Sequence, residues 1–220
     1  MSTQGFRAAA AGIDGVVLAG GYSSRMRTVA DVPCDKAWQM LADSTLIEHA
    51  ARNLGNQVNT LYISAAVADE RYRALGVPVH DPGGTSERRG PLAGVLAAMR
   101  VSTAQWLAVA PCDAPFLPED WVARLLQAAR RMDAPAALVV HRGWRQPVCM
   151  VVRCDLQTHL QAALGNGVRK VGQWQREVGA IEVALDAAAE HAFLNINTPE
   201  DLEQARTLVA RAQFSQRENS

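Results

Sequence analysis

The sequence predicts an α/β domain with a mainly parallel central sheet flanked by helices. Short apolar runs alternate with segments of helical period, which is typical of βαβ units. Polar and glycine-rich motifs follow several of these runs, as they do at the carboxyl ends of parallel strands. The 220 residues suffice for one domain of this class with a sizeable core, and two small domains are the less favoured arrangement.

The first half of the chain contains the clearest elements. Thr45 and Glu48 form a T-x-x-E capping box, and the apolar residues that follow share one helix face. Pro91 suits the first turn of a later helix. The expected elements are strands at 16–19, 60–64, 77–80 and 106–110, a short helix at 69–75, and helices from Thr45, from Pro91 and from Pro118 to about Met132.

The second half has a less regular hydrophobic pattern. Thr198 is the expected N-cap of a closing helix, with Pro199 in its first turn and the acids Glu200 and Asp201 at its positive end. Beyond about Arg211 the polar tail is expected to fray. The expected elements are strands at 136–140, 147–152, 181–185 and 193–196, and helices at 156–164 and 168–177.

Composition argues against several classes of protein. Twenty-two basic residues balance twenty-two acidic ones, so no global field attracts nucleic acid or an anionic membrane. No apolar run approaches the roughly 18 residues of a membrane span, and no secretory signal is evident. The four cysteines form no C-x-x-C pair, and the five histidines show no metal-ligand spacing. We therefore expect a cytoplasmic protein with reduced thiols and with neither nucleic-acid nor membrane partners.

Four motifs lie where open α/β sheets bind ligands. They are LAGGYSSRM…DK (18–36), the stretch that opens at Asp81, PCDAP (111–115) and NINTP (195–199). The glycine pair of the first motif lets backbone approach a phosphate, although neither G-x-x-x-x-G-K-[ST] nor G-x-G-x-x-G is present. Each motif alone is typical of an ordinary turn. Their occurrence together in this order predicts a ligand site.

The motifs VVLAGGYSSRM…DK, GPLAG, PCDAPFLP and NINTPEDL resemble those of the molybdenum cofactor guanylyltransferases, the molybdopterin-guanine dinucleotide biosynthesis protein A family. The resemblance covers about 14–209. It implies a Rossmann-like (GT-A-like) nucleotidyltransferase fold in one domain spanning 1–220, with its core at about 14–211. It also implies transfer of GMP from GTP to molybdopterin, or to molybdenum-molybdopterin, with release of pyrophosphate and use of Mg²⁺. Molybdoenzymes or their chaperones are the implied downstream partners.

The residues agree chemically with such a reaction. A nucleoside triphosphate brings about four negative charges, which require backbone N–H groups and placed cations. Arg25 can bind two phosphate oxygens at once, and Lys36 is a mobile point charge. Asp113 offers a hard carboxylate for Mg²⁺ held jointly with phosphates. We expect these three residues to be catalytic, with Asp113 as metal ligand, and Cys112 to be a partly buried thiol rather than a nucleophile.

No side-chain base is required for this transfer. The acceptor is a phosphate monoester with a second pKa of about 6, so it is largely ionised at neutral pH. Catalysis then consists of positioning and charge neutralisation at the α-phosphorus. The absence of a Ser-His-Asp or Cys-His arrangement agrees with this interpretation.

The resemblance also implies binding roles for particular residues. The LAGG sequence is that of guanylyl members, whereas cytidylyl relatives tend toward LAAG, and Asp81 offers an acceptor for the guanine N–H groups. Ser64 stands where the family often has Asn. Arg88 and Arg89 either meet the pterin phosphate or are solvated charges, and we prefer the second interpretation. The implied GTP contacts are Leu18, Ala19, Gly20, Gly21, Lys36, Ser64, Asp81 and Asp113; the implied molybdopterin contacts are Gly90, Pro91, Leu92, Asn195 and Asn197.

One departure from the family is the spacer Arg27–Cys34. It places eight residues between R-M and D-K, where relatives usually have about three. Lengthening a flexible loop by that ratio costs only about 0.9 kcal/mol in closure entropy. Lys36 is therefore still expected to reach the phosphates, and the spacer is interpreted as a tolerated extension.

Two other interpretations remain open at this point. The first is a nucleotidyltransferase that uses CTP or a sugar-phosphate acceptor, against which LAGG and NINTPEDL argue. The second is a catalytically lapsed, nucleotide-binding adaptor. The long spacer and Ser64 favour the adaptor, whereas the intact Lys36 and Asp113 oppose it.

Overall fold

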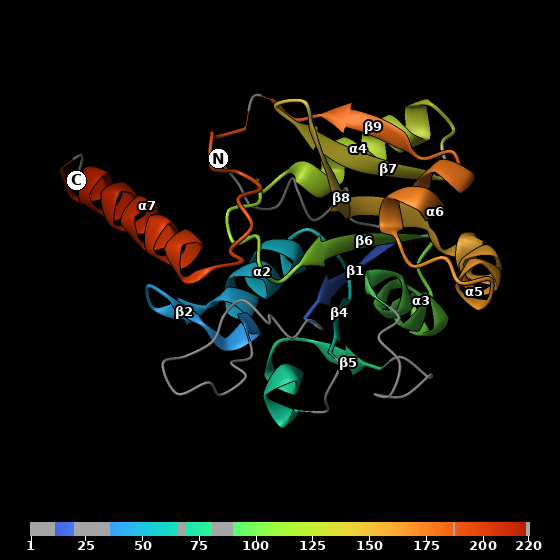
Figure 1. The fold of residues 1–220 in the computed structure, drawn as a ribbon, viewed down its shortest axis with the longest axis horizontal. Coiled ribbons are helices and arrows are strands. Elements are labelled where there is room, and N and C mark those ends of the chain that lie inside the picture. Colours follow the sequence, from blue (N-terminus) through green and yellow to red (C-terminus); the bar gives the residue numbers. More distant parts are fainter. Residues whose placement is uncertain (1–11, 20–35, 66–68, 81–89, 187, 219–220) are drawn as a thin grey trace.

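The structure is a computed structural model that describes residues 12–19, 36–65, 69–80, 90–186 and 188–218, with side chains described up to Arg211. Its centre is a seven-stranded sheet with strand order β5-β4-β1-β6-β8-β7-β9 (Figure 1). In chain order its strands are β1 (Ile13–Leu18), β4 (Leu61–Ser64), β5 (Val77–Val79), β6 (Trp106–Pro111), β7 (Ala136–His141), β8 (Trp144–Arg153) and β9 (Ile181–Ala184).

The sheet is mainly parallel, as the sequence predicts. β1 pairs in parallel with β4 and β6, β4 with β5, and β7 with β9. Among the described strands of this sheet, β8 alone runs antiparallel to its neighbours. It follows β7 through a two-residue turn in which Arg142 and Gly143 both have positive φ, the conformation that a tight hairpin requires.

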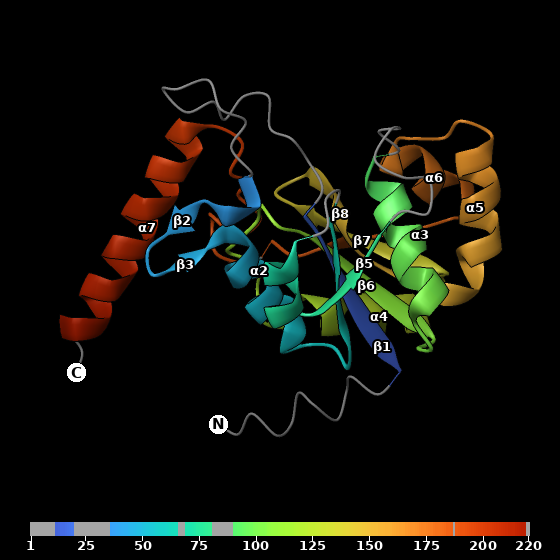
Figure 2. The same ribbon diagram turned by 90° about the horizontal axis from the view of Figure 1, so that it is seen from below.

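Helices cover both faces of the sheet (Figure 2). α2 (Leu46–Gly55) and α4 (Trp121–Arg131) pack on one face, and α3 (Pro91–Val101), α5 (Gln157–Gly165) and α6 (Val171–Glu177) pack on the other. Each face has its own hydrophobic cluster, with Trp121 fully buried in one and Trp174 fully buried in the other. This three-layer arrangement is the expected one for α/β proteins.

The order of the strands creates a crevice between the carboxyl ends of β1 and β6. From β1 the chain moves outward to β4 and β5, and then returns to the opposite side of β1 as β6. Such a reversal is where open α/β sheets bind ligands, because the connections on the two sides diverge. The strand ends are held together here, since the Cys112 N–H donates to the Leu18 carbonyl at 3.2 Å and the Ala19 N–H to the Ser64 carbonyl at 2.7 Å.

The last helix, α7 (Pro199–Glu218), extends away from the sheet (Figure 1). Its first turns pack on a small hairpin made of β2 (Met40–Leu41) and β3 (Ser44–Thr45). Leu202 and Ala205 contribute to a separate small cluster with residues of this hairpin and of α2. No helix within the described residues is long and apolar enough to cross a membrane.

Most predicted elements are confirmed, and a few differ from the prediction. The predicted strand at 193–196 is wrong, because Phe193 adopts φ +74° and the Ile196 N–H donates to the Asp113 carbonyl at 2.8 Å instead of joining a strand. The predicted fraying beyond Arg211 is also wrong, since α7 continues to Glu218. β8 begins earlier than expected, α4 and α6 begin later, and the β2–β3 hairpin was not predicted.

Candidate active site

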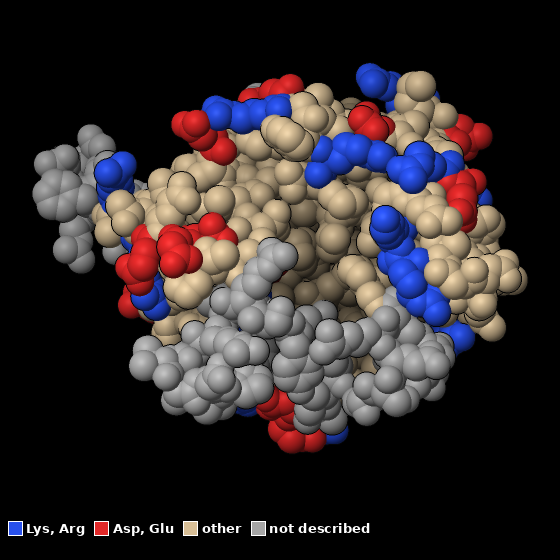
Figure 3. Space-filling model, in the orientation of Figure 1, with Lys and Arg blue, Asp and Glu red and all other residues tan. Residues whose placement is uncertain are grey.

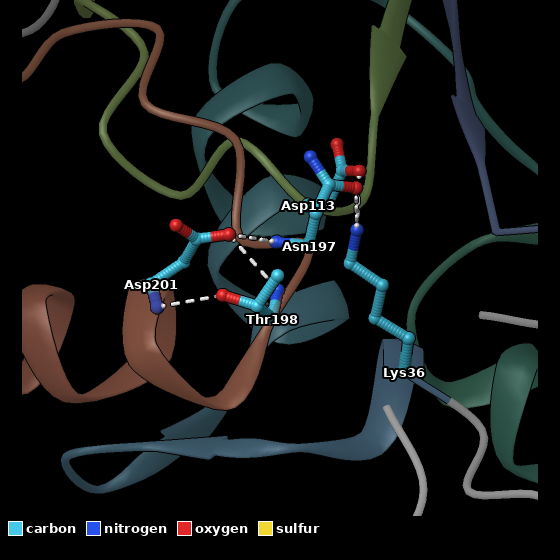
Figure 4. A network of polar contacts seen from close by, with 5 residues as sticks. All are labelled: Lys36, Asp113, Asn197, Thr198 and Asp201. Atoms are coloured by element: carbon cyan, nitrogen blue, oxygen red, sulfur yellow. Dashed lines mark hydrogen bonds and ion pairs between the residues drawn. The ribbon is translucent and has the colours of Figure 1, made fainter. Parts of the chain in front are cut away.

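The ammonium group of Lys36 lies at the centre of the candidate site (Figure 4). Its Nζ donates to Asp113 Oδ2 at 2.6 Å and to Asn197 Oδ1 at 2.7 Å. The Lys36 side chain is only 8% exposed, so these two acceptors replace most of the water that an ammonium otherwise binds. The contact joins three segments that lie far apart in the sequence, and all three were singled out by sequence motifs.

Lys36 opens a 3₁₀ turn, η2 (Lys36–Trp38), that leads into the β2–β3 hairpin. The Gln39 N–H donates to the Lys36 carbonyl at 3.1 Å, and the Leu46 N–H donates to the Gln39 carbonyl at 2.9 Å. Ala37 is almost fully buried in the cluster beneath α2. The turn is therefore fixed to the start of α2, and it directs the Lys36 side chain toward the end of β6 (Figure 4).

Asp113 follows the buried strand β6 at the crevice. Its backbone carbonyl accepts the Ile196 N–H, which ties the turn after β6 to the segment that precedes α7. Its side chain is 21% exposed, so the carboxylate is accessible from the carboxyl edge of the sheet. The apolar run of β6 thus ends by presenting one acid beside the Lys36 ammonium.

Asn197 is held in place by the N-terminus of α7 (Figure 4). The backbone N–H groups of Asn197 and Thr198 donate to Asp201 Oδ2 at 2.8 and 2.9 Å, and the Asp201 N–H donates to Thr198 Oγ1 at 3.1 Å. Burial alone raises the pKa of Asp201, but these hydrogen bonds and the nearby Lys36 charge lower it overall. The predicted N-cap is confirmed, and it leaves the Asn197 carboxamide free to face Lys36.

The residues at the crevice fit a magnesium ion that is shared with phosphates. Within the described residues, no three His, Cys, Asp or Glu side chains gather around one metal position. Asp113 nevertheless offers a partly exposed carboxylate at the strand end. Mg²⁺ commonly uses one or two carboxylates and completes its octahedron with substrate phosphates and water. A single acid is therefore sufficient for that mode of binding.

The structure adds a residue that the sequence did not suggest. Cys149 lies in an irregular part of β8, where the register with β7 shifts between Leu138 and Val139. Burial raises the pKa of the Cys149 thiol, and the neighbouring Asp113 carboxylate raises it further. Cys149 is therefore a neutral thiol beside the site, and Cys112 is buried, as expected. The start of β8 lies at the carboxyl edge because this strand runs antiparallel to β6 and β7, and its direction gave no recognisable signal in the sequence.

The start of α3 forms another border of the crevice. Gly90 is its N-cap with φ +71°, and a Cβ placed there would lie 3.5 Å from the Arg169 carbonyl. The loop with Arg169 and Lys170, both exposed, therefore lies next to the predicted molybdopterin-contacting residues. Gly90 and Pro91 are exposed, whereas Leu92 is fully buried. Figure 3 shows a hollow in this face with basic side chains on its margin.

Other predicted site residues are placed as follows. Leu18 ends β1, Ala19 follows it in a buried position, and Ser64 ends β4 half-buried beneath α3. Asn195 is half-buried, two positions before Asn197. Several predicted residues lie outside the described part of the chain: Gly20, Gly21, Arg25, Asp81, Arg88 and Arg89.

Comparison with known proteins identifies the family. Residues 15–179 match the MobA-like NTP transferase domain. A molybdenum cofactor guanylyltransferase from Shewanella frigidimarina is 36% identical over 201 residues, which cover 90% of this chain and 98% of that protein. One from Burkholderia vietnamiensis is 39% identical over 198 residues, which cover 86% of this chain and 93% of that protein.

A solved structure supports the fold. The molybdopterin-guanine dinucleotide biosynthesis protein A from Archaeoglobus fulgidus superposes with a TM-score of 0.72 at 20% identity, covering 90% of this chain and 99% of that one. This likeness therefore covers most of both chains. Together with the sequence relatives, it leads to one conclusion: the chain is a nucleotidyltransferase and belongs to the molybdenum cofactor guanylyltransferase family.

Proposed function

We propose that this protein transfers GMP from GTP to molybdopterin, or to its molybdenum form, and releases pyrophosphate. The observation that carries the proposal is the Lys36 ammonium held between Asp113 and Asn197 at the crevice between β1 and β6. This contact brings a cation, a carboxylate and an amide together at the edge of the sheet that is proposed to bind both substrates. The names of the sequence relatives support the choice of substrates.

Lys36 is the cation proposed to bind the triphosphate. In the structure its charge is compensated by one carboxylate and one amide oxygen. Arrival of a triphosphate supplies several anionic oxygens, so the flexible ammonium can exchange the Asn197 oxygen for phosphate. Arg25 and the backbone of Gly20 and Gly21 are proposed to bind the remaining phosphate oxygens.

Asp113 is the proposed ligand for Mg²⁺, together with phosphate oxygens of GTP. When bound, the ion supplies neutralisation of the charge that develops around the α-phosphorus and on the leaving pyrophosphate. Asp113 is proposed to hold the ion at a fixed position relative to the Lys36 ammonium. The Asp113 backbone carbonyl accepts the Ile196 N–H, and this hydrogen bond fixes the position of Asp113 relative to the segment that carries Asn197.

The acceptor is proposed to occupy the side of the crevice between α3 and the segment before α7. Gly90 and Pro91, both exposed, are proposed to offer their backbone, with the buried Leu92 behind them, and Asn195 and Asn197 to offer carboxamides. The exposed cations Arg169 and Lys170 lie close enough to this side to attract an acidic acceptor.

The proposed reaction is a direct displacement. An oxygen of the acceptor phosphate forms a bond to the α-phosphorus of GTP, and the bond from that phosphorus to the bridging α–β oxygen breaks. Pyrophosphate leaves with the bonding electrons. Because the acceptor phosphate is already ionised at neutral pH, no side chain has to remove a proton.

Guanine selection is proposed to rest on Asp81 and on the backbone of Leu18 and Ala19. A carboxylate accepts both guanine donors, N1–H and the N2 amino group, which cytosine does not present in this arrangement. We propose that the protein acts in the cytoplasm, where Cys112, Cys149 and Cys154 would stay thiols.

A pyrophosphate-release assay with each of the four nucleoside triphosphates, with and without molybdopterin, tests the proposal. Release is expected only with GTP and molybdopterin together. Arg124→Ala is the matched control, since this exposed cation on α4 pairs with Asp120 on the outer surface. Release that requires CTP or a sugar phosphate, or GTP binding without turnover, contradicts the proposed activity.

A further inference from the structure

The turn that carries Lys36 is clamped by an aromatic stack. Trp38, the last residue of η2, has its ring centroid 5.1 Å from that of Tyr72, with an interplanar angle of 36°. On the same ring, Arg71 places its guanidinium carbon 4.0 Å from the centroid. Tyr72 and Arg71 belong to the 3₁₀ turn η3 (Glu70–Ala74), which connects β4 to β5. The stack therefore links η2 to the connection between β4 and β5.

Both partners of Trp38 are themselves fixed. Tyr72 is 3% exposed and belongs to the same hydrophobic cluster as Ala37. The Arg71 guanidinium donates from Nε and Nη2 to the Asp69 carboxylate at 2.9 and 2.6 Å. Asp69 also caps η3, and the Arg71 hydrogen bonds lower its pKa. The indole therefore meets a buried ring and a guanidinium that is held in one orientation.

Lys36 depends on such a restraint because its own turn is short. η2 has three residues, and the Lys36 side chain must extend to reach Asp113 at 2.6 Å and Asn197 at 2.7 Å. Besides Lys36 itself, the turn contains one large side chain, that of Trp38. Movement of the indole would therefore move the Cα of Lys36 relative to the end of β6.

We propose that Trp38, held by Tyr72 and Arg71, is a positioning residue that keeps Lys36 in place for the triphosphate, an inference that rests on the proposed function. Trp38 itself touches no reacting atom. It acts by fixing the turn, and Arg71 contributes through a cation–π contact. At an exposed position, the loss of such a contact is expected to change the equilibrium between the held and the displaced turn by about two- to five-fold.

Chemical labelling of lysine tests the position of Lys36 directly. The chain contains two lysines, Lys36, whose side chain is 8% exposed, and Lys170, which is exposed. Limited acylation followed by peptide mass spectrometry therefore reports Lys36 with Lys170 as internal reference. Trp38→Ala is expected to raise the relative labelling of Lys36 at least five-fold, and Arg71→Ala about two- to five-fold.

Conservative and control variants make the labelling experiment specific. Trp38→Phe is expected to stay close to wild type, because Trp38 Nε1 donates to no group within the described residues. Arg73→Ala removes a neighbouring cation of η3 that pairs with Glu70, and it is expected to leave the relative labelling of Lys36 unchanged. Arg71→Ala carries the test if Trp38→Ala does not fold, since the Arg71 side chain is 61% exposed.

Kinetics with the same variants separate this inference from the proposed function. A rise in KM for GTP that parallels the increased labelling of Lys36, with an unchanged KM for molybdopterin, supports both the positioning role of Trp38 and the triphosphate-binding role of Lys36. Unchanged Lys36 labelling in folded Trp38→Ala and Arg71→Ala overturns the positioning role. Increased labelling with unchanged GTP kinetics leaves the positioning role standing and removes Lys36 from the proposed triphosphate site.

Discussion

At the scale of single residues, Lys36 is the group on which the site depends. A nearly buried ammonium requires partners for its donors, and it finds one carboxylate and one amide oxygen. The amide contact is uncharged and can be exchanged for phosphate without leaving a buried charge unpaired. These two contacts stabilise the Lys36 ammonium, and the exchangeable one is the contact that its proposed role toward a polyphosphate requires.

Lys36→Ala is expected to lower kcat/KM for GTP about 100-fold or more, because one charge-assisted contact to the reacting phosphates is lost. Steady-state pyrophosphate release at saturating molybdopterin measures the effect. Lys170→Ala, which removes the other lysine, should instead act mainly on the KM for molybdopterin. Wild-type GTP kinetics for Lys36→Ala would remove this residue from the site.

Asp113→Asn is expected to abolish Mg²⁺-dependent turnover while the protein stays folded. The amide oxygen of the new side chain can still accept from Lys36, but a neutral amide is a weaker ligand than a carboxylate for Mg²⁺. Turnover measured across a Mg²⁺ titration checks the loss of activity, and a thermal melt checks that the variant is folded. A fully active variant refutes the metal role.

At the scale of elements, two close contacts set the positions of the segments around the crevice. The first is the cap of α7, which fixes Asn197 through Asp201. The second is the packing of α3 against the ends of β1 and β4, where a Cβ on Gly94 would lie 2.4 Å from Ser64 Oγ and 2.8 Å from Leu18 Cδ2. Glycine at position 94 therefore lets α3 approach the crevice closely.

Asp201→Ala is expected to lower the free energy of unfolding by about 1 kcal/mol at pH 7, the usual cost of losing such a cap. The folded-state pKa of Asp201 is lowered, so its stabilisation is present above the unfolded pKa of about 3.9 and is lost as pH falls through the folded value. Urea unfolding of both proteins should thus differ at pH 7, and the difference should disappear only as the pH falls below about 3.9 and through the lowered folded-state pKa of Asp201. An equal difference at pH 7 and below that folded-state pKa contradicts the carboxylate's role.

Gly94→Ala is expected to destabilise the protein by about 1–3 kcal/mol, although alanine favours helix, because the added methyl group overpacks the α3 interface. Ser64→Ala in the same chain should recover part of the loss, since it removes the nearest clashing atom. Gly165→Ala in α5 is the matched control, because nothing lies within 4 Å of the added Cβ. Denaturant unfolding measures all three, and a neutral Gly94→Ala contradicts the close packing.

The elements also show what could be predicted from the sequence. The capping boxes at Thr45 and Thr198 were predictable, because their hydrogen bonds are local. The backbone at Phe193 was not predictable, since its φ of +74° accompanies tertiary packing of the buried ring against His141, with centroids 5.2 Å apart. The antiparallel direction of β8 likewise depends on pairing partners that periodicity does not reveal.

The same distinction between local signals and long-range contacts applies to the candidate site. Lys36 and Asp113 were predicted from motifs whose residue types match phosphate and metal chemistry, and the structure brings the two together. The hydrogen bond from Lys36 to Asn197 was not predicted, because these two residues lie 161 positions apart and their motifs carry no sign of contact. Arg169 and Lys170 were missed because two consecutive surface cations are common, and only the fold places them beside Gly90.

At the scale of the whole molecule, one sheet carries both hydrophobic clusters, so the chain is expected to unfold as one unit. Trp121 reports one cluster and Trp174 the other. Tryptophan fluorescence and far-ultraviolet circular dichroism should therefore give coincident denaturation curves. Two separate transitions would indicate two independent domains.

The proposed function also belongs to this scale, because its site is assembled from η2, the end of β6 and the start of α7. The most direct measurement is the transfer of label from [α-³²P]GTP to molybdopterin, with the product identified by mass spectrometry. Labelled molybdopterin guanine dinucleotide is expected with the wild-type protein and not with Asp113→Asn. Equal labelling by both proteins, or a labelled product only from CTP, would contradict the assignment of GMP transfer to this crevice.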